Sequence, residues 1–225
     1  MNGSYFSVPH LAYKEDAWQQ NEINLVSEGE TELWLNGRLY CHAVCTPEHL
    51  EDLAVGRMVA DGVISPQRPQ SLTVSSDPFR AEVNASVPCS VPALPADTDS
   101  LWTVDDLQKL ASTLRETPLY RATRSIHCAV LMRHGEQLCL REDIGRHNAL
   151  DKVIGWAVLH GVDLSECIVF SSGRLPLDMV QKALHAGIPV MASKSLPTAE
   201  SVALAGARGL TLLHISERWG ILRFP

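Results

Sequence analysis

The densest run of polar side chains is at residues 141–148, REDIGRHN, and Asp151 and Lys152 follow it closely. Asp and Asn side chains can hydrogen-bond a guanine or a ribose, and Arg side chains form charge-assisted bonds with phosphate oxygens. A loop that only leads into a helix does not need so many ionisable groups. For His147, an equally good interpretation is a structural histidine that hydrogen-bonds at the start of a helix and binds no ligand. The run is therefore a candidate binding site for an anionic, nucleotide-like ligand.

Basic side chains also lie at the ends of the other strands predicted in the second half. They are Arg124, Arg146, Arg174, Lys194 and Arg218, with Arg141 beside them. The chain has 19 Lys and Arg against 26 Asp and Glu, a net charge of −7, so this local group of cations needs an explanation. The alternative is that they are solvated loop ends paired with Glu142, Asp143 and Glu217. The number of basic side chains at these strand ends favours an anion-binding site over solvated loop ends.

The second half of the chain alternates strands and helices, which is typical of a mostly parallel sheet with right-handed crossovers. The predicted strands are 126–133, 137–141, 167–171, 188–192, 210–215 and 221–224, and the predicted helices are 148–160, 177–186 and 198–207. Parallel strands place their carboxyl ends at one edge of a sheet, where ligands bind in open α/β folds. The basic side chains and three helix starts are therefore expected to meet at one edge.

Small strands and one helix are predicted for the first half. The predicted strands are 22–27, 31–35, 39–45, 71–76 and 79–87, with a Glu-Gly turn after the first of them and an Asn36-Gly37 hairpin turn after the second. Thr46-Pro47 is typical of a helix start and Asp61-Gly62 of a helix end, which predicts a helix over 47–60. A Pro-rich segment follows, and a capping box of Thr103 and Asp106 opens a helix that ends near Glu116.

The composition is that of a globular protein, with 225 residues, 45% hydrophobic and 20% charged. The acidic total argues against a broad face for nucleic acid. No signal peptide and no run of about 18 apolar residues is visible, so no membrane span is expected. Of the six cysteines, four lie in strand-like apolar runs, which favours a reduced, cytoplasmic protein.

The sequence resembles the formate dehydrogenase accessory sulfurtransferase family, FdhD, over nearly its whole length. The stretches that carry the resemblance are TPEHLEDLAVGRMVADGVI (46–64), PLYRATRSIHCAVL (118–131), REDIGRHNALDKVIG (141–155) and SSGRLPLDMVQKALHAGIPVMASKSLPT (171–198). Several collinear motifs are far more specific than one short pattern.

The resemblance implies a fold and a function. It implies an α/β fold in which a small N-terminal α/β domain (1–87) and a Pro-rich loop with a connecting helix (88–117) precede a cytidine-deaminase-like, three-layer domain (118–225). It implies a sulfur carrier that takes persulfide sulfur from a cysteine desulfurase and passes it to the molybdenum (or tungsten) bis(molybdopterin guanine dinucleotide) cofactor, bound transiently. That cofactor is destined for a formate dehydrogenase apoenzyme. Relatives in this family are commonly homodimers.

The same resemblance implies which positions bind the cofactor. They are His127, Arg141, Glu142, Asp143, Gly145, Arg146, His147, Asn148, Asp151, Lys152, Ser172, Gly173, Arg174, Lys182, Ser193, Pro197 and Thr198, and more weakly Ile215, Ser216, Glu217, Arg218, Trp219 and Gly220.

The chain departs from the family pattern at the cysteine motif. The family carries Cys-Gly-x-Cys-Gly, whereas residues 88–93 are PCSVPA, so Cys89 matches the first cysteine and Pro92 replaces the second. One thiolate is enough to carry a persulfide, which makes Cys89 the candidate catalytic residue. The alternative is a non-catalytic protein that binds the cofactor or another guanine nucleotide and has lost sulfur transfer.

A zinc nucleobase deaminase would share the implied fold, but its ligands are missing. That chemistry requires His-x-Glu followed by Pro-Cys-x-x-Cys. Here His127-Cys128-Ala129 has no glutamate, and no Cys-x-x-Cys follows. The sequence therefore predicts no zinc and no other metal site.

Overall fold

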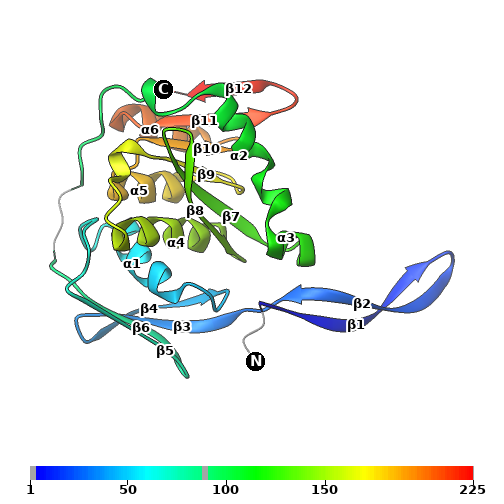
Figure 1. The fold of residues 1–225 in the computed structure, drawn as a ribbon. Coiled ribbons are helices and arrows are strands. Elements are labelled where there is room, and N and C mark those ends of the chain that lie inside the picture. Colours follow the sequence, from blue (N-terminus) through cyan, green and yellow to red (C-terminus); the bar gives the residue numbers. More distant parts are fainter. Residues whose placement is uncertain (1–3, 88–90, 225) are drawn as a thin grey trace.

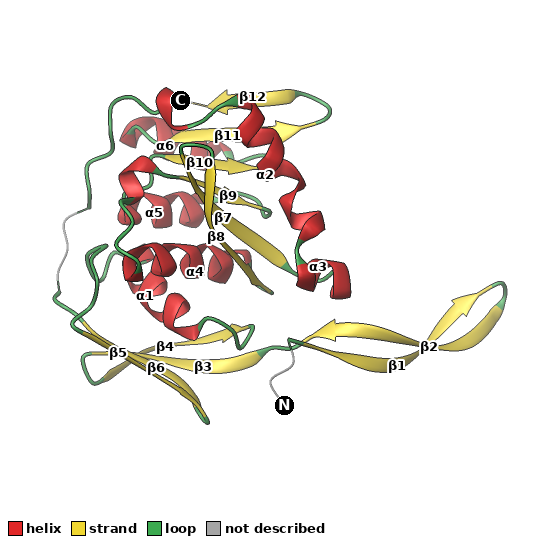
Figure 2. Cartoon of the chain, in the orientation of Figure 1, coloured by secondary structure: helices red, strands yellow, loops and turns green. Residues whose placement is uncertain are grey.

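The computed structural model describes residues 4–87 and 91–224, and Figures 1 and 2 show a mixed α/β fold. Its largest sheet has six strands in the order β12-β11-β10-β9-β7-β8. These are β7 (His127–Arg133), β8 (Glu136–Asp143), β9 (Ile168–Ser171), β10 (Val190–Ser193), β11 (Thr211–Ser216) and β12 (Gly220–Phe224). As predicted, β8, β9, β10 and β11 run in one direction, although β7 lies antiparallel between β8 and β9.

Both faces of this sheet are covered by apolar side chains from helices. One face packs against α4 (Arg146–Leu159), α5 (Leu177–Ala186) and α6 (Ala199–Arg208), through residues such as Val153, Met179 and Met191. The other face packs against α2 (Val104–Glu116), where Leu107 and Leu110 meet Phe170. The fully buried strands are continuous apolar runs for this reason.

The first half forms a four-stranded sheet in the order β4-β3-β6-β5, with one helix. Its elements are β3 (Gly29–Leu35), β4 (Arg38–Cys45), α1 (Leu50–Ala60), β5 (Ser71–Ser76) and β6 (Phe79–Asn84). The predicted Asn36-Gly37 hairpin is confirmed, since both residues take the left-handed conformation, with φ of 49° and 77°, that this turn requires.

Close contact between α1 and α4 joins the two halves. A Cβ atom on Gly56 would lie 1.7 Å from the carbonyl oxygen of Asp151, and one on Gly155 would lie 1.8 Å from that of Asp52. Only glycine allows two helix backbones to approach this closely. Leu33 and Val55 from the first half consequently share one core cluster with Ile154 from the second half.

The first hairpin was not among the predicted elements. β1 (Tyr5–Lys14) pairs antiparallel with β2 (Ala17–Val26) over their full lengths, and Figure 1 shows this two-stranded arm leaving the body. Residues 22–27 and 31–35 do form strands, but β2 pairs with β1, whereas β3 pairs with β4 and β6. The Glu-Gly turn therefore joins two sheets instead of closing a hairpin.

The predicted start of the first helix was also wrong, by three residues. α1 begins at Leu50, and His49 before it is left-handed, with φ of 56°. Thr46 does not cap the helix because its backbone N–H and its hydroxyl both donate to Asp143. A short helix, α3 (Pro118–Thr123), was not predicted either. No helix in the described ranges is long and apolar enough to cross a membrane.

Candidate functional site at the carboxyl edge of the sheet

The strand register brings the predicted segments to one edge of the six-stranded sheet. His127 pairs with Asp143, Ala129 with Ser171, and Ser171 with Ser193. Ser193 in turn pairs with His214 on β11. We call this end, where β8, β9, β10 and β11 finish and β7 begins, the carboxyl edge. It is the place where α/β folds of this kind bind ligands.

His127 and Arg146 lie on the two sides of the turn after β9. The Nδ1 atom of His127 is 3.2 Å from the Oγ of Ser172, whose hydroxyl also accepts a hydrogen bond from the Cys128 backbone N–H. A Cβ atom on Gly173 would lie 2.6 Å from Cδ of Arg146, so this position requires glycine. Burial lowers the pKa of His127 and the Arg146 guanidinium lowers it further, which keeps the imidazole neutral at pH 7.

Arg146 itself is held in place but not fully satisfied. It is the first residue of α4, and its Nε is buried without a hydrogen-bond partner in the described part of the chain. A buried guanidinium nitrogen without a partner is costly, and a ligand oxygen would remove that cost. The position, the charge and the unused donor all fit an anionic ligand.

His147 joins the starts of α4 and α5. Its Nε2 lies 2.8 Å from Oδ2 of Asp178, in the first turn of α5. Burial nevertheless lowers the pKa of His147. The side chain therefore lies between two helix starts at the carboxyl edge, with its Nε2 close to the Asp178 carboxylate but without a well-aligned hydrogen bond in the described part of the chain.

Ser193 and Thr198 shape the turns around the ends of β10 and α6. The hydroxyl of Ser193 donates to the Gly173 carbonyl over 2.7 Å and accepts from the Ser195 backbone N–H. Thr198, preceded by Pro197, is the N-cap of α6 and accepts from the Ser201 backbone N–H over 3.3 Å. These residues fix the backbone of the carboxyl edge.

Asp143 and Lys152 form a buried ion pair with no exposed surface. The Lys152 Nζ is 2.7 Å from Oδ2 of Asp143, and it also donates to the hydroxyl and carbonyl oxygens of Thr46. The other carboxylate oxygen of Asp143 accepts from the Gly145 backbone N–H and the Asn148 side-chain amide. All strong acceptors and donors of this group are thereby used within the protein. The predicted contact of Asp143 and Lys152 with a cofactor stays a prediction. Within the protein, this pair connects Thr46 to α4.

A second buried network surrounds Asp151 and Lys182. The Lys182 Nζ is 2.7 Å from Oδ1 of Asp151, and 3.4 Å from Asp61 at the end of α1. Asp61 also accepts from Arg57 and from the hydroxyl of Tyr40. These predicted binding residues connect α4 and α5 to α1, away from the strand ends.

Arg141 and Glu142 also form their hydrogen bonds within the protein. Arg141 donates to Asp52 of α1 over 2.7 Å, and burial raises the pKa of that carboxyl group while the guanidinium opposes the rise. Glu142 accepts backbone hydrogen bonds from Leu119 and Tyr120 and so caps the start of α3. Of the predicted cations, those left exposed at the carboxyl edge are Arg124, Arg174, Lys194 and Arg218.

The turn between β11 and β12 brings its own aromatic and basic groups to this edge. The Arg218 guanidinium lies 4.8 Å from the ring centroid of Trp219, and that ring lies 5.8 Å from His214. His214 is buried, and both its ring nitrogens are without partners in the described part of the chain. Ile215 is buried, whereas Ser216 is partly exposed and Glu217 and Gly220 are exposed.

Cys89 lies outside the described residues. The five described cysteines are Cys41, Cys45, Cys128, Cys139 and Cys167, and all are free thiols. Burial raises every one of their pKa values, to about 12 for Cys128, Cys139 and Cys167. A thiol in such surroundings is a poor nucleophile. Among the described residues, no group of three or more His, Cys, Asp or Glu side chains is placed to hold a metal ion.

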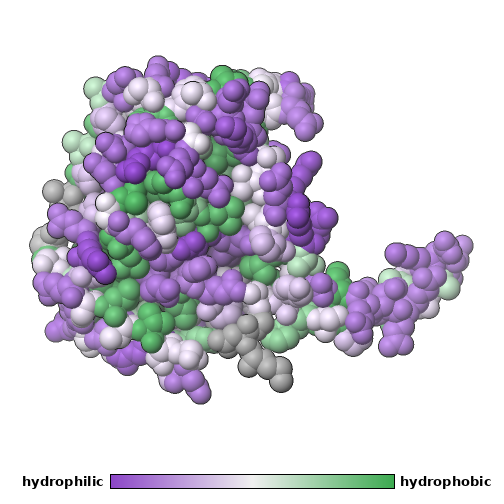
Figure 3. Space-filling view, in the orientation of Figure 1, coloured by the Kyte–Doolittle hydropathy of each residue, from purple (hydrophilic) through white to green (hydrophobic). Residues whose placement is uncertain are grey.

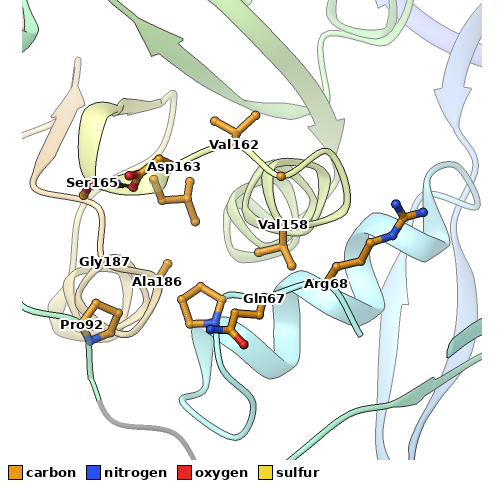
Figure 4. Close-up of a pocket in the computed structure, with 12 residues that line it drawn as sticks. Gln67, Arg68, Pro92, Val158, Val162, Asp163, Ser165, Ala186 and Gly187 are labelled. Atoms are coloured by element: carbon orange, nitrogen blue, oxygen red, sulfur yellow. Dashed lines mark hydrogen bonds between the residues drawn. The ribbon is translucent and has the colours of Figure 1, made fainter. Parts of the chain in front are cut away.

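Pro92, which replaces the second cysteine, lies at the other end of the sheet. It lines a cavity of about 390 Å³ with Val158 and Val162 near the end of α4, and with Ala186 and Gly187 at the end of α5 (Figure 4). A Cβ atom on Gly187 would lie 3.0 Å from that of Pro92. The chain after the cysteine position therefore packs at the end opposite to the carboxyl edge.

The side chains that tie the first half to the site were not predicted from the sequence. Thr46, Asp52, Arg57 and Asp61 each contact a predicted site residue, namely Asp143, Arg141, Asp151 and Lys182 in that order. They lie about 100 residues away from their partners along the chain, so no local pattern points to these pairs. The available signal lay in α1, where Glu51, Asp52 and Arg57 are charged although most of the helix is apolar and buried.

Comparison with known proteins gives a consistent result. Residues 81–219 match the model of the FdhD/NarQ family. The sulfur carrier protein FdhD of Mycobacterium tuberculosis is 33% identical over 235 residues, covering 84% of this chain and 85% of that protein. The protein of the same name from Geobacillus kaustophilus is 27% identical over 238 residues, covering 91% and 89%.

A solved structure agrees with this result. It is described as a formate dehydrogenase accessory protein from Desulfotalea psychrophila, and it superposes with a TM-score of 0.83 at 26% identity, covering 99% of this chain and 97% of that one. The family match spans well over half of the chain, and the M. tuberculosis relative is similar across most of its length. The chain belongs to the FdhD/NarQ family.

Proposed function

We propose that this protein is a sulfur carrier in the maturation of formate dehydrogenase. The single observation that carries the proposal is its similarity over 84% of the chain to proteins named sulfur carrier protein FdhD. The solved structure described as a formate dehydrogenase accessory protein supports the proposed role in formate dehydrogenase maturation. In this role the protein receives sulfur from a cysteine desulfurase and acts on the cofactor of a formate dehydrogenase apoenzyme, in the cytoplasm.

The proposed substrate is the molybdenum bis(molybdopterin guanine dinucleotide) cofactor, bound transiently at the carboxyl edge. Support comes from the cations there, above all Arg146 with its buried, unpartnered Nε, and the exposed Arg174. The start of α4 adds free backbone N–H groups, which favour anions. Binding and orienting a phosphate-rich ligand is what these residues are suited to do.

Cys89 is the proposed sulfur-carrying residue. Its thiolate attacks the terminal sulfur of a desulfurase persulfide, which forms Cys89–S–SH and releases the desulfurase thiolate, with no net oxidation. Delivery of that sulfur as sulfide breaks the S–S bond of the persulfide and requires two electrons, which an external thiol supplies by forming a mixed disulfide with Cys89. Support comes from the raised thiol pKa values of the five described cysteines, which leave Cys89 as the candidate nucleophile.

The test is persulfide formation in the full-length protein. Incubation with a cysteine desulfurase and cysteine should add one sulfur atom at Cys89, located by mass spectrometry of peptides. Cys89→Ser should abolish both the adduct and formate dehydrogenase maturation. Cys41→Ser is the matched control, because it removes a half-buried strand cysteine and should change neither.

A non-catalytic binding protein is the second candidate, and Pro92 is the observation that favours it. A proline at this position removes the second thiol of the family motif. If no sulfur appears on Cys89 while guanine nucleotide binding is intact, the carrier hypothesis fails and the binding protein remains. If Cys89 does carry sulfur, Pro92→Cys should speed its turnover.

A homodimer is also proposed, and the hairpin of β1 and β2 supports it. This arm has seven large apolar side chains that are more than two fifths exposed, at Tyr5, Phe6, Leu11, Tyr13, Trp18, Ile23 and Leu25. A two-stranded hairpin is only marginally stable by itself in water. A second copy of the chain would cover this surface.

A further inference from the structure

The cavity lined by Pro92, which we call the Pro92 cavity, lies close in the chain to Cys89. Pro92 follows Cys89 by three residues. Three residues span at most about 11 Å, which bounds the distance between the two Cα atoms. With its volume of about 390 Å³, the cavity falls in the range of small-molecule sites. A ligand bound there would be within reach of the proposed sulfur-carrying residue.

The chain on the other side of Cys89 reaches the same place. A smaller hollow of about 70 Å³ shares Gln67 and Arg68 with the Pro92 cavity. Ser86 lines this hollow and precedes Cys89 by three residues. The loop of Gln67 and Arg68, which follows α1, therefore borders the described chain on both sides of Cys89.

The floor of the Pro92 cavity is apolar and its walls are rigid. Val158, Leu164 and Ala186 line it and are buried. Pro66 and Pro92 also line it, and the ring of each proline fixes its φ angle. A hollow of this kind is formed before a ligand binds, and its floor accepts the carbon chain of a small molecule.

Two charged side chains lie on opposite sides of the cavity, Asp163 on one and Arg68 on the other, as Figure 4 shows. In the ranges 4–87 and 91–224 neither makes an ion pair. The Asp163 Oδ1 accepts hydrogen bonds from the hydroxyl and the backbone N–H of Ser165. These bonds lower the pKa of Asp163, so its carboxylate is charged at pH 7. A carboxylate and a guanidinium on opposite sides are complementary to a zwitterion.

The proposed sulfur transfer requires a thiol that the described chain does not offer. Pro92 replaces the second cysteine of the family motif. Burial raises the pKa of all five described cysteines, which makes them poor nucleophiles. The thiol that reduces the persulfide must therefore come from outside, and it must bind near Cys89 to react there.

We propose that the Pro92 cavity binds a zwitterionic low-molecular-weight thiol that releases the sulfur from Cys89, an assignment that rests on the proposed function. The bound thiolate attacks the inner sulfur of Cys89–S–SH. The S–S bond of the persulfide breaks, HS⁻ leaves, and a mixed disulfide joins Cys89 to the ligand. A second molecule of the thiol then reduces this disulfide, so two thiols supply the two electrons. The ammonium group of the ligand lies toward Asp163 and its carboxylate toward Arg68.

Calorimetric titration of the full-length protein with S-methylglutathione tests the site without sulfur chemistry, because the methyl group blocks the thiol. Arg68→Ala and Asp163→Asn should each weaken binding at least fivefold, and asparagine keeps the acceptor for Ser165. Arg208→Ala is the matched control, since it removes an exposed arginine at the end of α6, outside the cavity, and should leave the affinity unchanged. Urea unfolding of each variant confirms that it is folded.

Sulfide release tests the chemical role of the site. Full-length protein that a cysteine desulfurase has loaded with sulfur is desalted and mixed with glutathione or with 2-mercaptoethanol. The rate should saturate with glutathione, and Arg68→Ala should raise the half-saturating concentration at least fivefold. 2-Mercaptoethanol has no charged group, so its rate should be linear in concentration and equal in the two proteins.

The outcomes separate this inference from the proposed function. If wild-type protein does not bind S-methylglutathione, or if Arg68→Ala and Arg208→Ala weaken binding equally, the inference is wrong and the carrier function stands. A rate that is linear in glutathione and unchanged by Arg68→Ala would also overturn the inference alone. If Cys89 takes up no sulfur from the desulfurase, the carrier function itself fails, and the role of the bound thiol fails with it.

Discussion

At the scale of single residues, burial divides the polar stretch at 141–152 into two sets of side chains. Arg146 and His147 lie at the carboxyl edge, whereas Asp143, Asp151 and Lys152 are entirely buried. A buried charge must be paired, because removing it from water costs several kcal/mol. Each of the three has an oppositely charged partner within 2.7 Å. The same residue types thus hold the fold in one place and are available to a ligand in another.

Lys152→Met is expected to destabilise the protein strongly. The substitution leaves Asp143 buried without its ammonium partner, and breaking a buried pair from one side costs about 3–5 kcal/mol. Urea denaturation should show that loss in the free energy of unfolding. Lys109→Met removes an exposed lysine and should change it by less than about 0.5 kcal/mol. Equal effects in the two variants would contradict the structural role of the pair.

His127 is expected to make stability depend on pH. Burial lowers its pKa in the folded protein below the value of about 6.5 in the unfolded chain. The unfolded state therefore binds more protons below pH 6.5, and the free energy of unfolding falls as the pH drops from 7 toward 5. In His127→Gln this dependence should be shallower. An unchanged slope, measured by urea titrations across that range, would show that His127 does not contribute.

At the scale of elements, the crossing of α1 and α4 decides how the two halves assemble. Gly56 and Gly155 face each other's helix backbone, and the buried pairs of Asp52, Asp143 and Asp151 lie around that contact. The glycine contact and the ion pairs support each other, because neither can form at a larger separation. The site at the carboxyl edge consequently depends on an element that carries none of its ligand-binding groups.

Gly56→Ala is expected to lower the free energy of unfolding by about 1–3 kcal/mol or more, since the new methyl group would overlap the Asp151 carbonyl. Gly206→Ala makes the same chemical change at an exposed position inside α6. There it should raise stability by about 0.5–1 kcal/mol, because alanine favours a helix over glycine. Thermal and urea unfolding of both variants would show opposite signs. Two shifts of the same sign would refute the close-contact explanation.

At the scale of the whole molecule, the arm of β1 and β2 stands away from the body, as the space-filling view in Figure 3 shows. Leu11, Tyr13 and Trp18 lie on one face near its tip and are 60 to 67% exposed, and the two rings are 5.4 Å apart. An apolar face of this kind on a long hairpin is typical of a contact surface.

Sedimentation equilibrium should therefore find a dimer, and the double variant Leu11→Ser, Trp18→Ser should shift it toward monomer. Val104→Ser removes an apolar side chain that is 52% exposed from α2 and should leave the dimer intact. A wild-type protein that is monomeric at every concentration tested would contradict the proposed role of the arm.

Most of the second half of the fold could be predicted from the sequence. Alternating apolar strands and amphipathic helices predict parallel strands. A helical crossover returns the chain to the same end of the sheet, and such crossovers are right-handed. The meeting of residues 142–148, 171–176, 193–198 and 216–220 at the carboxyl edge followed from that topology alone. The Asn36-Gly37 hairpin was equally local, since two left-handed residues define the turn.

Which polar residues are buried could not be predicted from the sequence, because it depends on contacts between distant parts of the chain. Asp143 and Asp178 look alike in sequence, yet one holds Thr46 and Lys152 inside the protein and the other is exposed beside His147. That difference arises from the approach of α1 to α4, a contact between residues about 100 positions apart. Local sequence patterns do not show which distant residues will meet, because these contacts form only once the chain has folded.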